Sequence, residues 1–227
     1  NGWFGTTGII TKLSLQLFPK LPFKDVLIYA STKIDDFVDA MHEVSMYEIC
    51  EDLLGMYMGL MGKTILLAMV FSGHSQEELD FKRKILINVL DEFKSKPNPE
   101  TGKKRRISLM KGLPQNIIDS LLIVPPPEIA RTMGDVRKGG GAEYLGSYIP
   151  FESIKEVFEG GREISKKYGL AEATYIIRAI SLNHSIMFAL NYPYNRKIEE
   201  ERKIVEEQLK ETTELILRVG GYPGNPM

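Results

Sequence analysis

The sequence predicts an α+β fold in which helices cover one face of an antiparallel sheet, with a ferredoxin-like arrangement as the specific expectation. Strand-like and helix-like segments occur along the 227 residues without the unbroken β-α-β alternation of a parallel sheet. A hydrophobic fraction of 43% and a balance of 29 basic against 30 acidic residues are typical of a globular domain. No internal repeat is visible at a fixed period.

The chain opens with two glycines, Gly5 and Gly8, that lead into an apolar alternating run at 9–18, which predicts a strand. Glycine permits close approach of the backbone, so this pattern is typical either of amides pressed against a flat or anionic ligand or of a tight turn. The proline-marked connector that follows predicts a domain boundary. We therefore expect residues 1–23 to complete one domain and residues 24–227 to form a second. Because it opens on Asn1 with a strand of a larger sheet, the chain reads as part of a longer polypeptide.

The first half of the second domain is expected to alternate between strands and helices. We expect a strand at 25–30, a helix at 34–44 capped by Ser31 or Thr32, a helix at 47–54, a short segment at 56–61, a central strand at 64–72, and a helix that Ser75 caps and Pro97–Pro99 end.

The second half begins with loop-rich sequence at 106–141, including a short helix at 115–122. The elements expected after it are a strand at 143–149, a helix at 151–168 stopped by Gly169, strands at 173–180 and 185–192, and a helix at 196–219 closed by Gly220 and Gly221.

Composition also limits the classes of function. The longest apolar run, 65–71, is far shorter than the roughly 20 residues of a membrane span, so no span and a cytoplasmic location are expected. The near-neutral charge gives no reason to expect nucleic acid. The basic cluster Lys103–Arg106 is interpreted as a solvated loop in preference to a phosphate patch. The single cysteine, Cys50, is expected to be a small buried apolar residue. The three histidines lie far apart, so no metal is expected.

Three stretches resemble the FAD-linked oxidases of the vanillyl-alcohol oxidase type, a family that includes para-cresol methylhydroxylase and glycolate or D-lactate dehydrogenases. They are Gly5–Lys12, Gly139–Pro150 and His184–Asn195. The resemblance implies that residues 1–23 are the last strand and linker of an FAD-binding domain, and that residues 24–227 are the substrate or cap domain.

The same resemblance implies a cofactor, FAD, and a site. The flavin would contact Gly5, Thr6, Thr7, Gly8, Ile9 and Ile10. Glu143 falls where the family places a histidine bonded to the flavin, so the FAD is expected to be non-covalent and held only together with an N-terminal flavin-binding half. The family's Tyr-Arg pair for a phenolate would lie near Gly224 and Asn225, which makes a phenolic substrate doubtful.

If the chain is such a substrate domain, His184 and Arg178 are its candidate catalytic residues. His184 has a pKa suited to proton transfer, and Arg178 could clamp a carboxylate, although either could be a structural residue of the sheet. Glu143 and Tyr148 are the candidate substrate-proximal residues. Tyr144 and Tyr148 share one face of their strand, which could be the flavin side or a packed helix side.

The sequence and the resemblance leave two alternative functions for this chain. The first is part of an FAD-dependent oxidoreductase that passes a hydride from an alcohol or 2-hydroxy acid to FAD. The second is an inactive α+β binding or assembly module that forms a homo-oligomer. The expected partners are the small-molecule substrate and the flavin-binding half.

Overall fold

The computed structural model describes residues 20–57, 63–112, 118–119, 140–170, 172–180 and 185–224, together with the single positions 12, 14 and 17. Its strands are β1 (Phe23–Ser31), β2 (Asp52–Tyr57), β3 (Ile65–Gly73), β4 (Ile107–Leu109), β5 (Gly140–Pro150), β6 (Thr174–Ile180), β7 (Ser185–Asn195) and β8 (Tyr222–Pro223). Its helices are α1 (Ile34–Ser45), α2 (Gln76–Ser95), α5 (Ile154–Tyr168) and α6 (Glu199–Arg218), with a 3-10 turn, η2 (Phe151–Ser153), before α5.

The strands form one antiparallel sheet in the order β4-β1-β3-β2-β6-β7-β5-β8. The sheet consists of two units with the same chain order, strand-helix-strand-strand-helix-strand, and the same spatial order of strands, 4-1-3-2. This is the ferredoxin-like arrangement, present twice. The units meet where β2 pairs with β6, with Leu54 opposite Arg178.

The sequence shows no repeat at a fixed period, so this duplication is one of topology alone. Only the pattern of apolar faces is shared between the units, and such a pattern tolerates different residues and different loop lengths.

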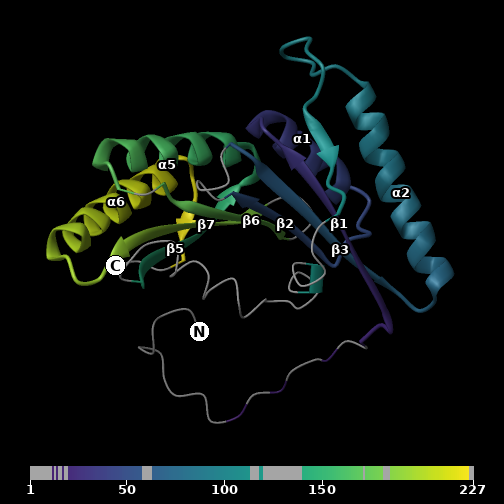
Figure 1. The fold of residues 1–227 in the computed structure, drawn as a ribbon, viewed down its shortest axis with the longest axis horizontal. Helices are drawn as coiled ribbons and strands as arrows, with labels where there is room; N and C mark the ends of the chain where they lie inside the picture. The colour runs from purple at the N-terminus through teal and green to yellow at the C-terminus, as the bar shows by residue number, and fades with distance from the viewer. Residues whose placement is uncertain are drawn as a thin grey trace.

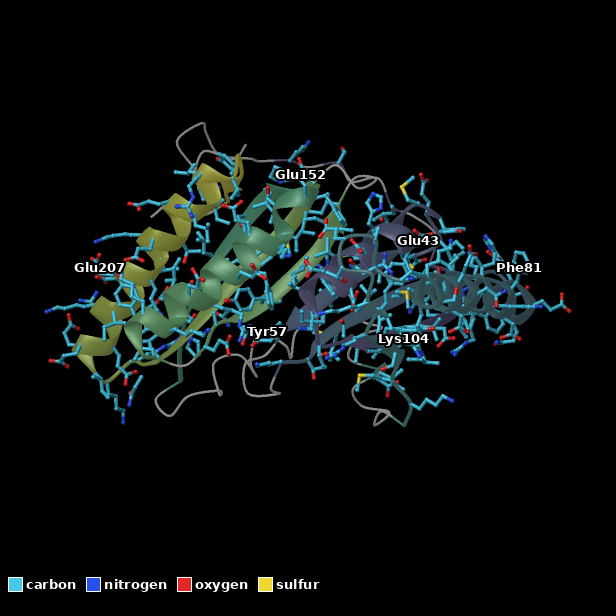
Figure 2. The ribbon with its side chains drawn as sticks, turned by 90° about the horizontal axis from the view of Figure 1, so that it is seen from above. Glu43, Tyr57, Phe81, Lys104, Glu152 and Glu207 are labelled. Carbon is cyan, nitrogen blue, oxygen red and sulfur yellow. The ribbon has the colours of Figure 1, made fainter. Side chains whose placement is uncertain are left out.

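The four helices lie on one face of the sheet, as Figure 1 shows, which confirms the expected layering. Seen from above, α5 and α6 lie side by side over one unit, and α1 and α2 lie over the other (Figure 2). One continuous apolar core fills the space between helices and sheet across both units. The Lys155 ammonium also pairs with the Asp35 carboxylate at 2.6 Å, joining α5 to α1.

Local chemistry explains where several elements begin and end. Ser75 caps α2 as predicted, because its Oγ accepts the backbone N–H of Glu78 at 3.1 Å. Gly169 ends α5 with a φ of 68°, a left-handed conformation that favours glycine. The prediction that Ser31 or Thr32 caps α1 is wrong. Lys33 occupies the N-cap, and the Ser31 Oγ is hydrogen-bonded to the Lys33 backbone instead.

The predicted helix at 47–54 is also wrong, because Asp52–Tyr57 is the interior strand β2. A strand buried on both faces lacks apolar-polar alternation, so its sequence resembles a buried helix. In this segment, Gly55 indicates a strand against which a helix packs closely. A Cβ placed there would lie 2.4 Å from the Phe37 ring of α1.

Two short edge strands, β4 and β8, were not predicted. The other expected elements are confirmed within three residues at their ends. They are β1, β3 in the sheet interior, β5, β6, β7, α2, α5 and α6. Most of the predicted strand at 9–18 and most of the helix at 115–122 lie outside the described residues.

Candidate functional site

Several predicted site residues lie outside the part of the chain that the structure describes. They are Gly5, Thr6, Thr7, Gly8, Ile9, Ile10 and His184. The predicted residues that can be placed are Arg178, Glu143 and Tyr148.

Glu143 and Tyr148 lie on opposite faces of the sheet. Both belong to β5, and side chains five residues apart on a regular strand point in opposite directions. The Glu143 carboxylate faces the helical layer and accepts a hydrogen bond from the Tyr194 hydroxyl at 3.0 Å. Tyr148 lies on the opposite face, so the structure does not bring the two together.

That opposite face carries tyrosines near its β5–β8 edge. Tyr144 and Tyr148 are 46% and 48% exposed, which places them on the helix-free side of β5 rather than in the core. Tyr222 of β8 is the register partner of Tyr148 and shares its face. Burial and the neighbouring Tyr148 raise the pKa of Tyr144, while the charge of Arg178 lowers it. The two tyrosines of β5 and Arg178 therefore belong to one electrostatic environment.

Arg178 lies on the same face, in register with Tyr148. Arg178 of β6 is opposite Met187 of β7, and Met187 is opposite Tyr148 of β5. Arg178 and Tyr148 are thus two strands apart in one row, about 10 Å at the usual strand spacing. The row crosses the seam between the two units, where Arg178 is opposite Leu54.

A carboxylate holds one edge of the Arg178 guanidinium. The Asp52 Oδ1 lies 2.9 Å from Nε, and Nη2 donates to Asp52 Oδ2 at 3.0 Å. The Asp52 side chain is 8% exposed and that of Arg178 is 24% exposed. Burial raises the pKa of the Asp52 carboxyl, and the charge and hydrogen bond of Arg178 oppose that rise. The pair is therefore a partly buried ion pair that fixes the guanidinium in place.

Around this pair the face is apolar. On the side of the first unit, a cluster packs separately from the main core; its buried members are Val26, Ile28, Leu54, Ala68 and Val70. Met110 and Ile118, which follow β4, pack against it. Arg178 and the tyrosines of β5 border this apolar cluster on the helix-free side of the sheet.

Sequence reasoning missed Asp52 and Tyr222. Asp52 was assigned to a helix, so its place beside Arg178 was not visible. Tyr222 follows Gly220 and Gly221, where the chain was expected only to close the last helix. The signal that could have found both is the strand assignment of their segments.

Cys50 is partly buried against the core rather than fully buried. Burial and the nearby Asp52 raise the pKa of its thiol to about 12, so it is a neutral thiol near pH 7. Among the described residues, no group of three or more His, Cys, Asp or Glu is placed to hold a metal ion. None of the described helices is long and apolar enough to cross a membrane.

Solved structures share this fold. p-Cresol methylhydroxylase with substrate bound matches with a TM-score of 0.67 and 17% identity, over 89% of this chain and 45% of that chain. The chain has the fold of the cap domain of FAD-linked oxidases. 4-Ethylphenol oxidase from Gulosibacter chungangensis, in complex with isoeugenol, matches with a TM-score of 0.63 and 13% identity, over 90% of this chain and 45% of that one.

Alkyldihydroxyacetonephosphate synthase matches with a TM-score of 0.59 and 11% identity, over 88% of this chain and 40% of that chain. The chain therefore spans less than half the length of these solved structures. No family model and no curated protein matches the sequence.

Proposed function

We propose that this chain is the substrate domain of an FAD-dependent oxidoreductase, and that it works together with a flavin-binding half. The observation that carries the proposal is the polar row of Arg178 and Tyr148 on an otherwise apolar sheet face, in a fold shared with flavoenzymes. The substrate is an alcohol or a 2-hydroxy acid.

When bound, FAD would supply the redox chemistry by accepting a hydride from a C–H bond next to oxygen. The residues of this chain bind and orient the substrate and exclude water. The proposal that the flavin is non-covalent rests on the resemblance, in which Glu143 takes the place of the flavin-bonded histidine; in the structure Glu143 lies on the helical face, opposite the row of Arg178 and Tyr148.

Arg178 would bind the substrate oxygen. Its Nε and Nη2 edge is held by Asp52, which leaves the Nη1 edge to donate hydrogen bonds to a substrate oxygen that gains negative charge as its proton is removed. Because Asp52 already compensates much of the charge of Arg178, this geometry favours an alcohol over an anionic hydroxy acid. His184 would accept the hydroxyl proton, a role that comes from the resemblance.

Arg178→Met in the FAD-loaded polypeptide is expected to lower kcat/KM by about 100-fold, because a donor aimed at developing charge is lost. The assay uses glycolate, D-lactate and vanillyl alcohol with an electron-accepting dye, and follows the substrate that the wild type oxidises fastest. Arg218→Met, an equal change of charge on the exposed surface of α6, serves as the control.

Tyr148→Phe keeps the exposed ring and removes only a hydroxyl, so it tests the same face without threatening the fold. Its kcat/KM is expected to fall about tenfold. Wild-type kinetics in both Arg178→Met and Tyr148→Phe would contradict a substrate site on this face.

A further inference from the structure

A cavity lies on the helical side of the first unit, on the other side of the sheet from Arg178. It has a volume of about 530 Å³ and lies between the start of α1 and the loop that joins α2 to β4. Cationic side chains dominate its lining: Lys33, Lys103, Lys104, Arg105 and Arg106. Figure 2 labels Lys104 in this loop.

The two carboxylates of the lining are already engaged. Asp35 pairs with Lys155 at 2.6 Å. Asp36 accepts the backbone N–H of Arg106 at 2.7 Å and lies 3.9 Å from Arg105 Nη1. In the described part of the chain, the side chains of Lys33, Lys103, Lys104 and Arg106 have no carboxylate at ion-pair distance. The cavity therefore carries uncompensated positive charge.

The loop that presents these cations is built rigidly around Asn98. The buried Asn98 side chain accepts the backbone N–H groups of Glu100 and Thr101, each at 3.0 Å. The Asn98 N–H donates to the Lys103 carbonyl at 2.9 Å, and the Gly102 N–H donates to the Asn98 carbonyl at 2.8 Å. The backbone that carries Lys103 and Lys104 is thus set by the fold before any ligand arrives, which lowers the entropic cost of ordering the loop on binding.

Arg105 forms a buried wall of the cavity. Its Nη1 donates to Asp39 at 2.6 Å, and its guanidinium carbon lies 3.9 Å from the centre of the Phe93 ring. Its Nε is buried and has no hydrogen-bond acceptor among the described residues. A buried N–H group without an acceptor is costly, and it adds to the positive charge that the fold keeps beside the cavity.

We infer that this cavity binds a small polyvalent anion of the phosphate class. Its volume suits a small molecule, and several cations around one space match a compact ligand with more than one negative charge. None of the described residues that line it is aromatic, so these residues offer no surface on which a nucleobase would stack. A phosphate compound without a base fits best. The site is independent of the oxidoreductase proposal.

The test is titration calorimetry of the protein with sodium pyrophosphate in buffer of fixed ionic strength. The wild type is expected to bind one equivalent. The double variant Lys103→Gln with Lys104→Gln is expected to bind at least tenfold more weakly. The matched control, Lys197→Gln with Lys203→Gln near and on α6, removes the same charge from exposed positions and is expected to change Kd less than twofold.

Three results would overturn the inference. The first is no saturable binding by the wild type. The second is an equal loss of affinity in both double variants, which would show attraction to net charge alone. The third is equal binding of citrate, a polycarboxylate, which would exclude selection for phosphate. All four lysines are exposed, so the variants are expected to fold, and their melting temperatures check this.

Discussion

Phe37→Ala is expected to lower the free energy of unfolding by about 3–5 kcal/mol. Phe37 is completely buried in α1, and its ring fills the space above Gly55 in β2. Gly55 offers no side chain that could move into the gap, and its neighbours Leu67 and Ile177 belong to paired strands that cannot close on it. The loss would be measured by urea denaturation.

Phe81→Ala is the matched control for this prediction. This substitution makes the same chemical change on α2. The Phe81 side chain, however, is 65% exposed, at the outer end of the helical layer (Figure 2). We expect a change within about 0.5 kcal/mol. Equal losses in the two variants would contradict the packing of α1 on the sheet.

Asp52→Leu is expected to cost about 3 kcal/mol, because it leaves the Arg178 guanidinium on an apolar face without its carboxylate. The double variant Asp52→Leu with Arg178→Met removes both charges and is expected to recover most of that loss. The measurement is a double-mutant cycle by urea denaturation. Additive losses would show that the two side chains do not interact.

In the single variant Arg178→Met, the loss in the free energy of unfolding is expected to depend on pH. Burial already raises the pKa of Asp52, and removing Arg178 takes away the charge that opposes this rise. A carboxyl whose pKa is higher in the folded than in the unfolded state destabilises the fold as pH increases above the unfolded value of about 3.9. Arg178→Met should therefore be less destabilised near about pH 5 than near about pH 8, whereas the double variant should show no such difference.

The parts of the fold that the sequence predicts well are those with local chemical signals. Ser75 before an apolar helical stripe and Gly169 after one mark the ends of α2 and α5, and the uninterrupted apolar run of β3 marks an interior strand. The segment at 47–54 lacks such signals. Its conformation as β2 depends on pairing with β3 and β6, which lie far away in the sequence.

The candidate site was predicted only in part for the same reason. Arg178 and Tyr148 could be named from the sequence, but their row across β6, β7 and β5 depends on strand register. The pairing of Asp52 with Arg178 joins residues of two different units, so neither local pattern nor spacing reveals it. Glu143 was placed near the substrate by resemblance, whereas the alternation of β5 turns it toward the helices.

The most direct test of the central claim is to purify the complete polypeptide that its open reading frame encodes, including this chain, and to record its visible absorption. A substrate domain joined to a flavin-binding half predicts a yellow protein that releases intact FAD when it is denatured, because the cofactor is not covalently bonded. A folded, colourless protein that takes up no added FAD would contradict the account and favour a binding or assembly module.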